Sequence, residues 1–339
     1  MGAVNTGLSW VGVGGTPSTF EAPLCEVGAG AASTLNCHLG SSGKMSGKYF
    51  TYKDLLFLGG CCSPEALQFI EEEFQVQEDD IFNVTFPKSG SFWMTEILCL
   101  IRSMGDVSWV HSVPNWERVP WIEAAFGWKN LLALPQPRLL SSHLPIQFFP
   151  KSFFQSRAKV IYTARDPRDV CASFFHFSKI MKLYQEPESS EAFIEEFLSG
   201  AVPFGSWFDH VKGWLGLKEQ SNFLLVTYEE LKKDIRGSIE RIAKFLGVDL
   251  NRAALEQVVD NCSFQKMKEN PMSNFSLLPP NYMNHGQGTF YRKGVCGEWK
   301  NFLTVAQSEH FGRIYQEKMK DFSVHFPWED PEVRGTLKS

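Results

Sequence analysis

The stretch IFNVTFPKSGSFW, residues 81–93, decides the fold of this chain. Its first six residues form an apolar run that predicts a buried strand, and a helical pattern begins directly after the turn PKSGS. A strand that turns into a helix through Lys, Ser and Gly presents free backbone N–H groups and the positive end of a helix dipole. The segment therefore predicts a site for a phosphate-like anion, with Lys88 at its rim.

This turn differs from the common nucleotide loop. The pattern G-x-x-x-x-G-K-[ST] is absent here, because Lys88 comes before Gly90 rather than after it. The chain is therefore expected to bind an anion through the same kinds of group, backbone N–H groups and a helix dipole, but with a different sequence motif.

Two further runs repeat the same arrangement of strand and helix. Residues 159–164 (KVIYTA) and 223–227 (FLLVT) are short, rich in strand-forming residues, and each is followed by a helical stretch. Short buried strands that alternate with helices are typical of a parallel sheet. We expect an α/β fold: a single domain with a central parallel sheet flanked by helices, in which residues 81–93 form a P-loop-like strand-loop-helix.

Composition limits the classes of function. The chain has 339 residues, 43% of them hydrophobic, and a net charge of −5, so no global field favours nucleic acid. No apolar run approaches the length of about 18–20 residues that a membrane span needs. The eight cysteines have neither disulfide-framework nor zinc spacing, which predicts free thiols in a reducing compartment.

The two ends of the chain differ from the rest. Residues 1–44 are rich in Gly, Ala, Ser and Thr, and they are predicted to be a disordered leader. A globular domain is expected over residues 45–330, and residues 331–339 are expected to be a C-terminal tail. Residues 262–298 are irregular, and so long a loop in a compact domain is usually functional.

Basic and hydroxyl groups follow each of the three predicted strands. Lys88 follows the first strand, Arg165 the second and Tyr228 the third, and ligands of parallel sheets bind beyond the carboxyl ends of the strands. Arg165 and Ser173 could hold a second phosphate, because a guanidinium binds one bidentately. Taken alone, however, the RDPRD and RKG sequences are more often salt-bridged or solvated turns.

Three longer segments carry a resemblance to a known family. TFPKSGSFW (85–93), ARDPRDVCASFFHF (164–177) and RKGVCGEWKNFLTVAQ (292–307) resemble the signature regions of the cytosolic sulfotransferases. Between them, SVPNWERVPW, SSHLPIQFFPKSFF, GSWFDHVKGW and MKENPMSNFSLL resemble the hydroxysteroid (alcohol) branch of that family. The resemblance runs from about residue 50 to residue 329 in the family's order.

The resemblance implies a donor, 3′-phosphoadenosine 5′-phosphosulfate (PAPS), a product, adenosine 3′,5′-bisphosphate, and no metal. The residues that match donor contacts are Lys88, Ser89, Gly90, Ser91, Phe92 and Trp93 in the phosphosulfate loop, Arg165 and Ser173 at the 3′-phosphate, Tyr228, Cys262, Ser263, Phe264 and Met267 on the adenine side, and Arg292, Lys293 and Gly294 in a closing loop.

Three residues match the family's catalytic groups. His143, in SSHLP, would be the general base, and its ordinary pKa of about 6.5 suits that task near neutrality. Lys88 would stabilise charge on the leaving phosphate, and Ser173 would hold Lys88 back until the acceptor binds. From composition alone, a histidine in such a segment is more often structural, and only the motif reverses that interpretation.

The implied acceptor is a small apolar molecule with a hydroxyl group, most plausibly a hydroxysteroid. The positions that would line its pocket are Trp116, Trp121, His143, Phe177, Met181 and Tyr282. Any one of these aromatic or methionine residues could equally be an ordinary core residue. Residues 270–290 would form a lid over both ligands.

The segment KNFLTVAQSE resembles the family's dimer motif through Lys300, Thr304, Val305 and Glu309, which implies a homodimer in the cytoplasm. A solvated helix start with Thr304 as its cap explains the same residues without a dimer.

Two alternatives remain open from the sequence: a catalytically silent steroid- or lipid-binding member of the family, and a small-molecule kinase. Three departures from the family pattern bear on donor binding. Phe92 replaces a polar residue, Cys262 stands where a hydroxyl is common, and Glu298 replaces an aspartate.

Overall fold

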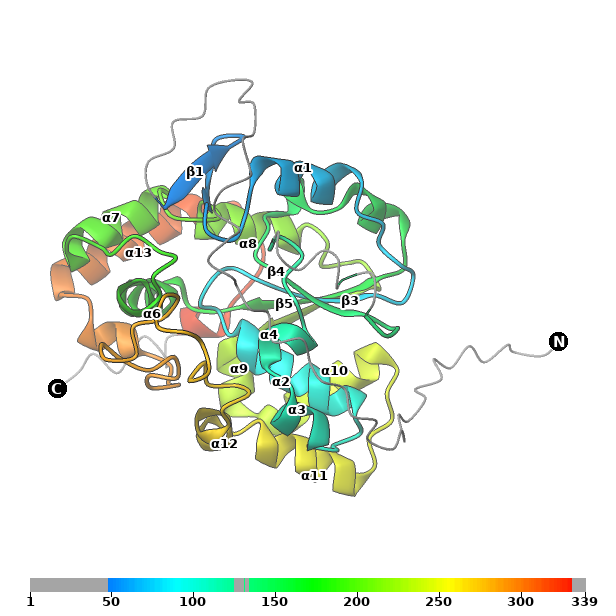
Figure 1. Cartoon of the computed structure of the whole chain (residues 1–339). Helices are drawn as coiled ribbons and strands as arrows, with labels where there is room; N and C mark the ends of the chain where they lie inside the picture. The colour runs from blue at the N-terminus through cyan, green and yellow to red at the C-terminus, as the bar shows by residue number, and fades with distance from the viewer. Residues whose placement is uncertain (1–47, 125–130, 132–133, 331–339) are drawn as a thin grey trace.

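The computed structural model describes residues 48–124, 131 and 134–330. The expected leader (1–44) and tail (331–339) lie outside the described residues. A four-stranded sheet has the order β4-β3-β5-β6, with β3 at Ile81–Thr85, β4 at Leu139–Ser142, β5 at Lys159–Ala164 and β6 at Phe223–Thr227. Every neighbouring pair in this sheet is parallel, which confirms the predicted α/β fold (Figure 1).

Three of these strands were predicted from the sequence, and one was not. The runs at 159–164 and 223–227 have the predicted bounds, and β3 ends one residue earlier than expected. The missed strand, β4, is only four residues long and has the sequence LLSS. Such a short segment carries no strand pattern of its own, and its pairing with residues 81–84 of β3 fixes it as a strand.

Helices cover both faces of the sheet. Side chains of a strand alternate between faces, so Phe82 and Val84 join one apolar core while Ile81 joins the other. The first core packs against α1 (Pro64–Glu72), α6 (Pro167–Ile180), α7 (Ser190–Ser199), α8 (Trp207–Leu215) and α13 (Val305–Met319). The second packs against α2 (Ser91–Arg102), α3 (Ser108–Ser112), α9 (Tyr228–Lys233), α10 (Ile235–Leu246) and α11 (Arg252–Asn261). Figure 1 shows α1 and α8 on one side of the sheet and α2, α10 and α11 on the other.

The remaining elements lie around this core. An antiparallel hairpin joins β1 (Tyr49–Tyr52) to β2 (Leu55–Leu58). The short elements are α4 (Asn115–Arg118), α12 (Phe264–Glu269), η1 (Ile146–Phe148), η2 (Lys151–Gln155), η3 (Glu298–Asn301) and η4 (Pro327–Glu329). Within the expected irregular stretch, residues 270–297 form turns and bends with a single bridge between Met181 and Met283. In the described part of the chain, no helix has both the length and the apolarity to cross a membrane.

Candidate active site

The loop between β3 and α2 has the geometry of an anion cradle. Lys88 and Gly90 both have positive φ angles, 69° and 113°, and Gly90 caps the N-terminus of α2 without a side-chain hydrogen bond. A Cβ atom at Gly90 would come within 3.0 Å of the Tyr228 ring, so the position needs glycine for its space as well as for its φ. The first N–H groups of α2 are therefore open to a bound anion.

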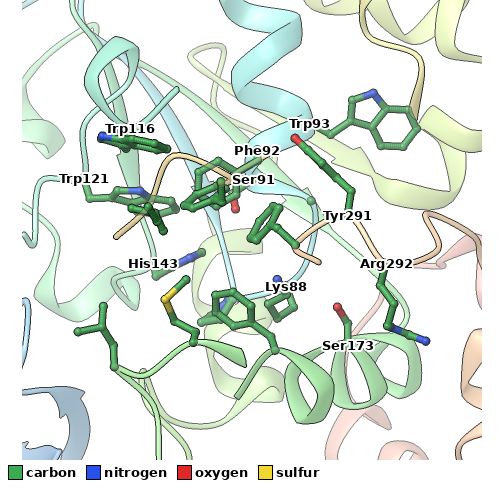
Figure 2. A pocket seen from close by; sticks show the side chains of 18 of the residues that line it. Lys88, Ser91, Phe92, Trp93, Trp116, Trp121, His143, Ser173, Tyr291 and Arg292 are labelled. Atoms are coloured by element: carbon green, nitrogen blue, oxygen red, sulfur yellow. The ribbon is translucent and has the colours of Figure 1, made fainter. Parts of the chain in front are cut away.

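A cavity of about 1300 Å³ extends from this loop past His143 to Trp121 and Trp116 (Figure 2). It collects most of the site residues expected from the sequence: Lys88, Gly90, Ser91, Phe92, Trp93, Trp116, Trp121, His143, Arg165, Ser173, Phe177, Met181, Tyr228, Phe264, Met267, Tyr282, Arg292, Lys293 and Gly294. Ser89, Cys262 and Ser263 do not line it. Ser89 is fully buried, the Cys262 carbonyl accepts a hydrogen bond from Trp93 Nε1 (2.8 Å), and Ser263 caps α12.

Lys88 lies between the two ends of the cavity, against aromatic rings. Its Nζ is 3.6 Å from the centroid of the Phe177 ring and 4.5 Å from that of Phe290. Burial, together with the positive charges of Arg165 and Arg292, lowers the pKa of Lys88 to about 7. Without a bound anion, this site therefore favours loss of the lysine proton, and an anion beside Nζ would restore the charge.

The His143 ring is held by the end of β3. Its Nδ1 is 2.7 Å from the Thr85 carbonyl oxygen, and a carbonyl only accepts, so Nδ1 carries the proton. The lone pair is therefore on Nε2. Burial lowers the pKa of His143 from its ordinary value of about 6.5 to about 3. The imidazole is neutral, and able to accept a proton, throughout the neutral range.

The missed strand β4 explains the position of His143. His143 is the first residue after Leu139–Ser142, at the carboxyl end of the edge strand, as Lys88 and Arg165 are near the ends of β3 and β5. Its ring packs on the Trp121 indole with the centroids 4.2 Å apart. A strand end is where side chains meet a ligand, so four strands contribute to this site rather than the three predicted.

The cations Arg165, Arg292 and Lys293 line one end of the cavity, the cationic end, and they already interact with protein groups. Arg292 and Lys293 both pair with Glu298, at 3.3 and 2.5 Å. Arg165 donates to the carbonyls of Lys88 and Val295 and lies over the Tyr228 ring, 4.2 Å from its centroid. Arg165, directly after β5, and Arg292 and Lys293, in the late loop at residues 270–297, thus lie at the same end of the cavity.

Flat side chains stand beside these cations. Trp93 and Tyr228 meet edge to face with centroids 5.1 Å apart, and Phe264 similarly meets Tyr291 at 5.9 Å. Gly294 passes so close to Phe264 that a Cβ atom there would lie 2.2 Å from the ring, which excludes any other residue without rearrangement. This end offers aromatic faces and edges to a planar group such as a nucleobase.

The Phe92 side chain points away from the cationic end and packs in an aromatic cluster. Its ring contacts Phe275 at 4.7 Å, Phe290 at 5.0 Å and Trp121 at 5.9 Å between centroids. Phe275 and Phe290 belong to the late loop and stack at 4.3 Å. Sequence reasoning did not single out either residue, although both lie in or beside the expected lid.

Within the described residues, no group of three or more His, Cys, Asp or Glu side chains is arranged to hold a metal ion. The site combines an anion cradle, several cations and a buried neutral histidine with an apolar chamber. Together with the parallel sheet, this combination defines a nucleotide-dependent enzyme that transfers a small anionic group to an apolar acceptor.

The family follows from comparison with known proteins. Residues 78–323 match the family described as Sulfotransferase domain, and the chain belongs to this family. Human sulfotransferase 2B1 is 52% identical over 296 residues, which cover 87% of this chain and 81% of that protein. The 3-beta-hydroxysteroid sulfotransferase of Cavia porcellus is 49% identical over 269 residues, covering 79% of this chain and 93% of that protein. The crystal structure of mouse sulfotransferase SULT7A1 complexed with PAP has a TM-score of 0.69 and 31% identity, and the match covers 81% of this chain and 95% of that one.

Proposed function

We propose that this enzyme transfers the sulfonate group of PAPS to the hydroxyl group of a hydroxysteroid. The observation that carries the proposal is a single cavity with cations and aromatic rings at one end, aromatic walls at the other, and Lys88 and His143 where the two meet. The names of the relatives support a hydroxysteroid acceptor, and the PAP bound to SULT7A1 supports a PAPS donor.

The reaction assigns one task to each central residue. The acceptor oxygen forms a bond to sulfur while the bond from sulfur to the bridging phosphate oxygen breaks. The acceptor's proton passes to Nε2 of His143, and adenosine 3′,5′-bisphosphate leaves with the bond electrons. Lys88 would stabilise the charge that grows on the bridging oxygen. Ser173 lines the same side of the cavity as Lys88 and Arg292 (Figure 2), where it could hold the lysine between turnovers.

The donor would occupy the cationic end. Backbone N–H groups of the loop from Lys88 to Trp93 would bind the 5′-phosphosulfate, and Arg165, Ser173 and Arg292 would bind the 3′-phosphate. Trp93, Tyr228, Phe264 and Met267 would surround the adenine. Ser89, Cys262 and Ser263 do not line the cavity and would act through their backbones.

The acceptor would occupy the aromatic end. The cavity lining includes five residues expected around the acceptor, Trp116, Trp121, Phe177, Met181 and Tyr282. Flat rigid walls suit a fused-ring steroid, whose hydroxyl would lie against Nε2 of His143.

Isotope-labelled PAPS tests the proposal directly. The protein should transfer label to hydroxysteroids in preference to phenols and amines, and it should bind adenosine 3′,5′-bisphosphate more tightly than ADP. Transfer to no acceptor in the panel, with steroid binding retained, would favour a silent binding protein. Preference for ADP would favour the kinase.

Three further assignments complete the proposal. A single domain would span residues 45–330, which contain the family match at 78–323. Two copies would pair through the segment around Lys300, Thr304, Val305 and Glu309, since the Val305 side chain is 74% exposed at the start of α13. A cytoplasmic location is supported by the free thiols in the described residues, including the adjacent Cys61 and Cys62, whose sulfurs are 3.7 Å apart.

A further inference from the structure

The main chain of His143 is held on both sides by buried polar side chains. The His143 N–H donates to Glu123 Oε1 at 2.7 Å, and the His143 carbonyl oxygen lies 3.1 Å from His210 Nε2. Glu123 is 3% exposed and His210 2%. Neither residue belongs to β4 or to the loop that carries the histidine, so both contacts are tertiary.

The direction of each hydrogen bond at His210 follows from its partners. The His143 carbonyl can only accept, so Nε2 of His210 carries the ring proton. The other ring nitrogen, Nδ1, lies 2.8 Å from the Tyr162 hydroxyl and must accept from it. Burial raises the pKa of Tyr162 well above its usual value and lowers that of His210 to about 3, so the phenol stays protonated and the imidazole neutral.

Helix α8 supplies a second, parallel contact. Trp214 lies one turn after His210 on α8, and its Nε1 donates to the carbonyl of Leu144 at 3.0 Å. Two ring N–H groups on one helix face thus hold two successive carbonyls, those of residues 143 and 144. Because both rings are buried, a shift of this segment without α8 would leave two buried N–H groups unpaired, which is costly.

Glu123 holds the opposite side of the same residue. Burial raises the pKa of this carboxyl to about 7, but Oε1 can accept the His143 N–H in the neutral and the charged form alike. Its second oxygen is buried without a hydrogen-bond partner among the described residues. Glu123 also lines the cavity, and a buried carboxyl oxygen without a partner is costly, which a purely space-filling role does not explain.

We propose that Glu123, His210 and Tyr162 are positioning residues for His143, which fix its main chain so that Nε2 stays aligned with the acceptor hydroxyl. The inference rests on the proposed function of His143 as the base. With the ring held at Nδ1 by Thr85, the base is fixed at its ring, its N–H and its carbonyl. Such constraint matters because a displacement of about 1 Å in a reacting group can cost on the order of 100-fold in rate.

Paired substitutions distinguish a positioning role of these residues from a role in packing. Glu123→Leu and His210→Leu each remove one contact, whereas Glu123→Gln keeps a carbonyl acceptor and His210→Gln keeps an N–H donor. We expect the leucine variants to lose about 10- to 100-fold in kcat, with the acceptor KM and the affinity for adenosine 3′,5′-bisphosphate little changed. The glutamine variants should recover most of the loss. Tyr162→Phe, a smaller change, should lower kcat in the same direction by less.

A double-mutant cycle gives the decisive readout. If Glu123 and His210 act through the base, their leucine substitutions should cost nothing further in a His143→Ala background, measured as single turnovers of labelled PAPS. Equal losses with and without His143, or glutamine variants as impaired as the leucine ones, would overturn the inference and leave sulfonate transfer intact as a function.

A spectroscopic measurement tests the same contacts without relying on activity. In NMR spectra of protein with isotopically labelled histidine, His143 should be the Nδ1–H tautomer and His210 the Nε2–H tautomer. Glu123→Leu and His210→Leu should shift the ring signals of His143, and the glutamine variants should restore them. Unchanged His143 signals in both leucine variants would overturn the inference. Failure of wild-type protein to transfer sulfonate at all would count against the proposed function instead.

Discussion

The Nζ atom of Lys88 lies over the face of the Phe177 ring, 3.6 Å from the ring centroid. The residue proposed to face the breaking S–O bond is thus desolvated by an aromatic wall of the acceptor pocket, and two arginines add repulsion. Lys88 therefore gains its positive charge when an anion binds beside it, so its protonation is coupled to donor binding.

Binding of the donor should therefore be accompanied by uptake of a proton by Lys88. The pKa of Lys88 is about 7 in the free protein, so at pH 8 most of the lysine is neutral, and a bound phosphate raises that pKa again. Calorimetry of adenosine 3′,5′-bisphosphate binding in buffers of different ionisation enthalpy should show uptake of about one proton per ligand at pH 8. Affinity should then fall as the pH rises above 7. Lys88→Met should abolish the uptake, whereas Lys179→Met, which alters an exposed lysine on α6, should not; the same uptake in both variants would contradict the assignment.

Replacing His143 should remove turnover but spare donor binding. His143→Ala is expected to lower kcat by about 100- to 10,000-fold, because it removes the group proposed to take the acceptor's proton. Affinity for adenosine 3′,5′-bisphosphate should be unchanged. Since the pKa of His143 is about 3, the imidazole remains neutral well below pH 6, and its protonation should not limit kcat/KM there. A wild-type acid limb near pH 6.5 that disappears in His143→Ala would show that the ring titrates normally.

Phe92→Ala should weaken binding of the acceptor but not binding of the donor. The side chain contacts Trp121, Phe275 and Phe290, so its loss opens the aromatic end of the cavity, and only its backbone N–H remains for the donor. We expect the acceptor KM to rise several-fold, with the donor affinity within about 2-fold of wild type. Measurement of both constants decides the matter, and a selective loss of donor affinity would mean that the ring itself contacts PAPS.

Glu298 should compete with the donor for two cations. Arg292 and Lys293 pair with Glu298 in the ligand-free protein, and a 3′-phosphate would have to share or displace these contacts. Glu298→Gln should raise the affinity for adenosine 3′,5′-bisphosphate by about 2- to 5-fold, as expected for a partly exposed ion pair. Arg292→Ala should lower that affinity. Titration calorimetry at low and moderate salt would check both, and equal affinities in all three proteins would exclude the loop from the donor site.

Val305 should be central to self-association. It is 74% exposed at the first position of α13, directly after the Thr304 cap, and an isolated apolar side chain there fits a small two-fold contact. Val305→Glu should convert a dimer into a monomer at micromolar concentration in sedimentation, with kcat retained. A wild-type monomer at that concentration would refute the dimer, and Thr304 would then be simply a helix cap.

The sequence predicted those parts of the fold whose signals are local. The runs at 159–164 and 223–227 are strands with the expected bounds because each is a continuous stretch of strand-forming residues. The turn after β3 was predicted because Lys, Ser and Gly between an apolar strand and a helix are typical of an anion-binding turn. By contrast, β4 is a strand only because β3 lies beside it, and nothing within LLSS announces this.

The sequence by itself determined the parallel α/β fold and the anion loop around Lys88, because these depend on short patterns. Motifs kept in order also indicated many, but not all, of the residues that line the cavity. Only the tertiary structure decided how those residues behave. Burial moved the pKa values of Lys88 and His143, Phe92 turned towards the acceptor, and Glu123 and His210 met at the main chain of His143. Desolvation and long-range hydrogen bonds depend on neighbours that are distant in the chain, and no local pattern of residues encodes them.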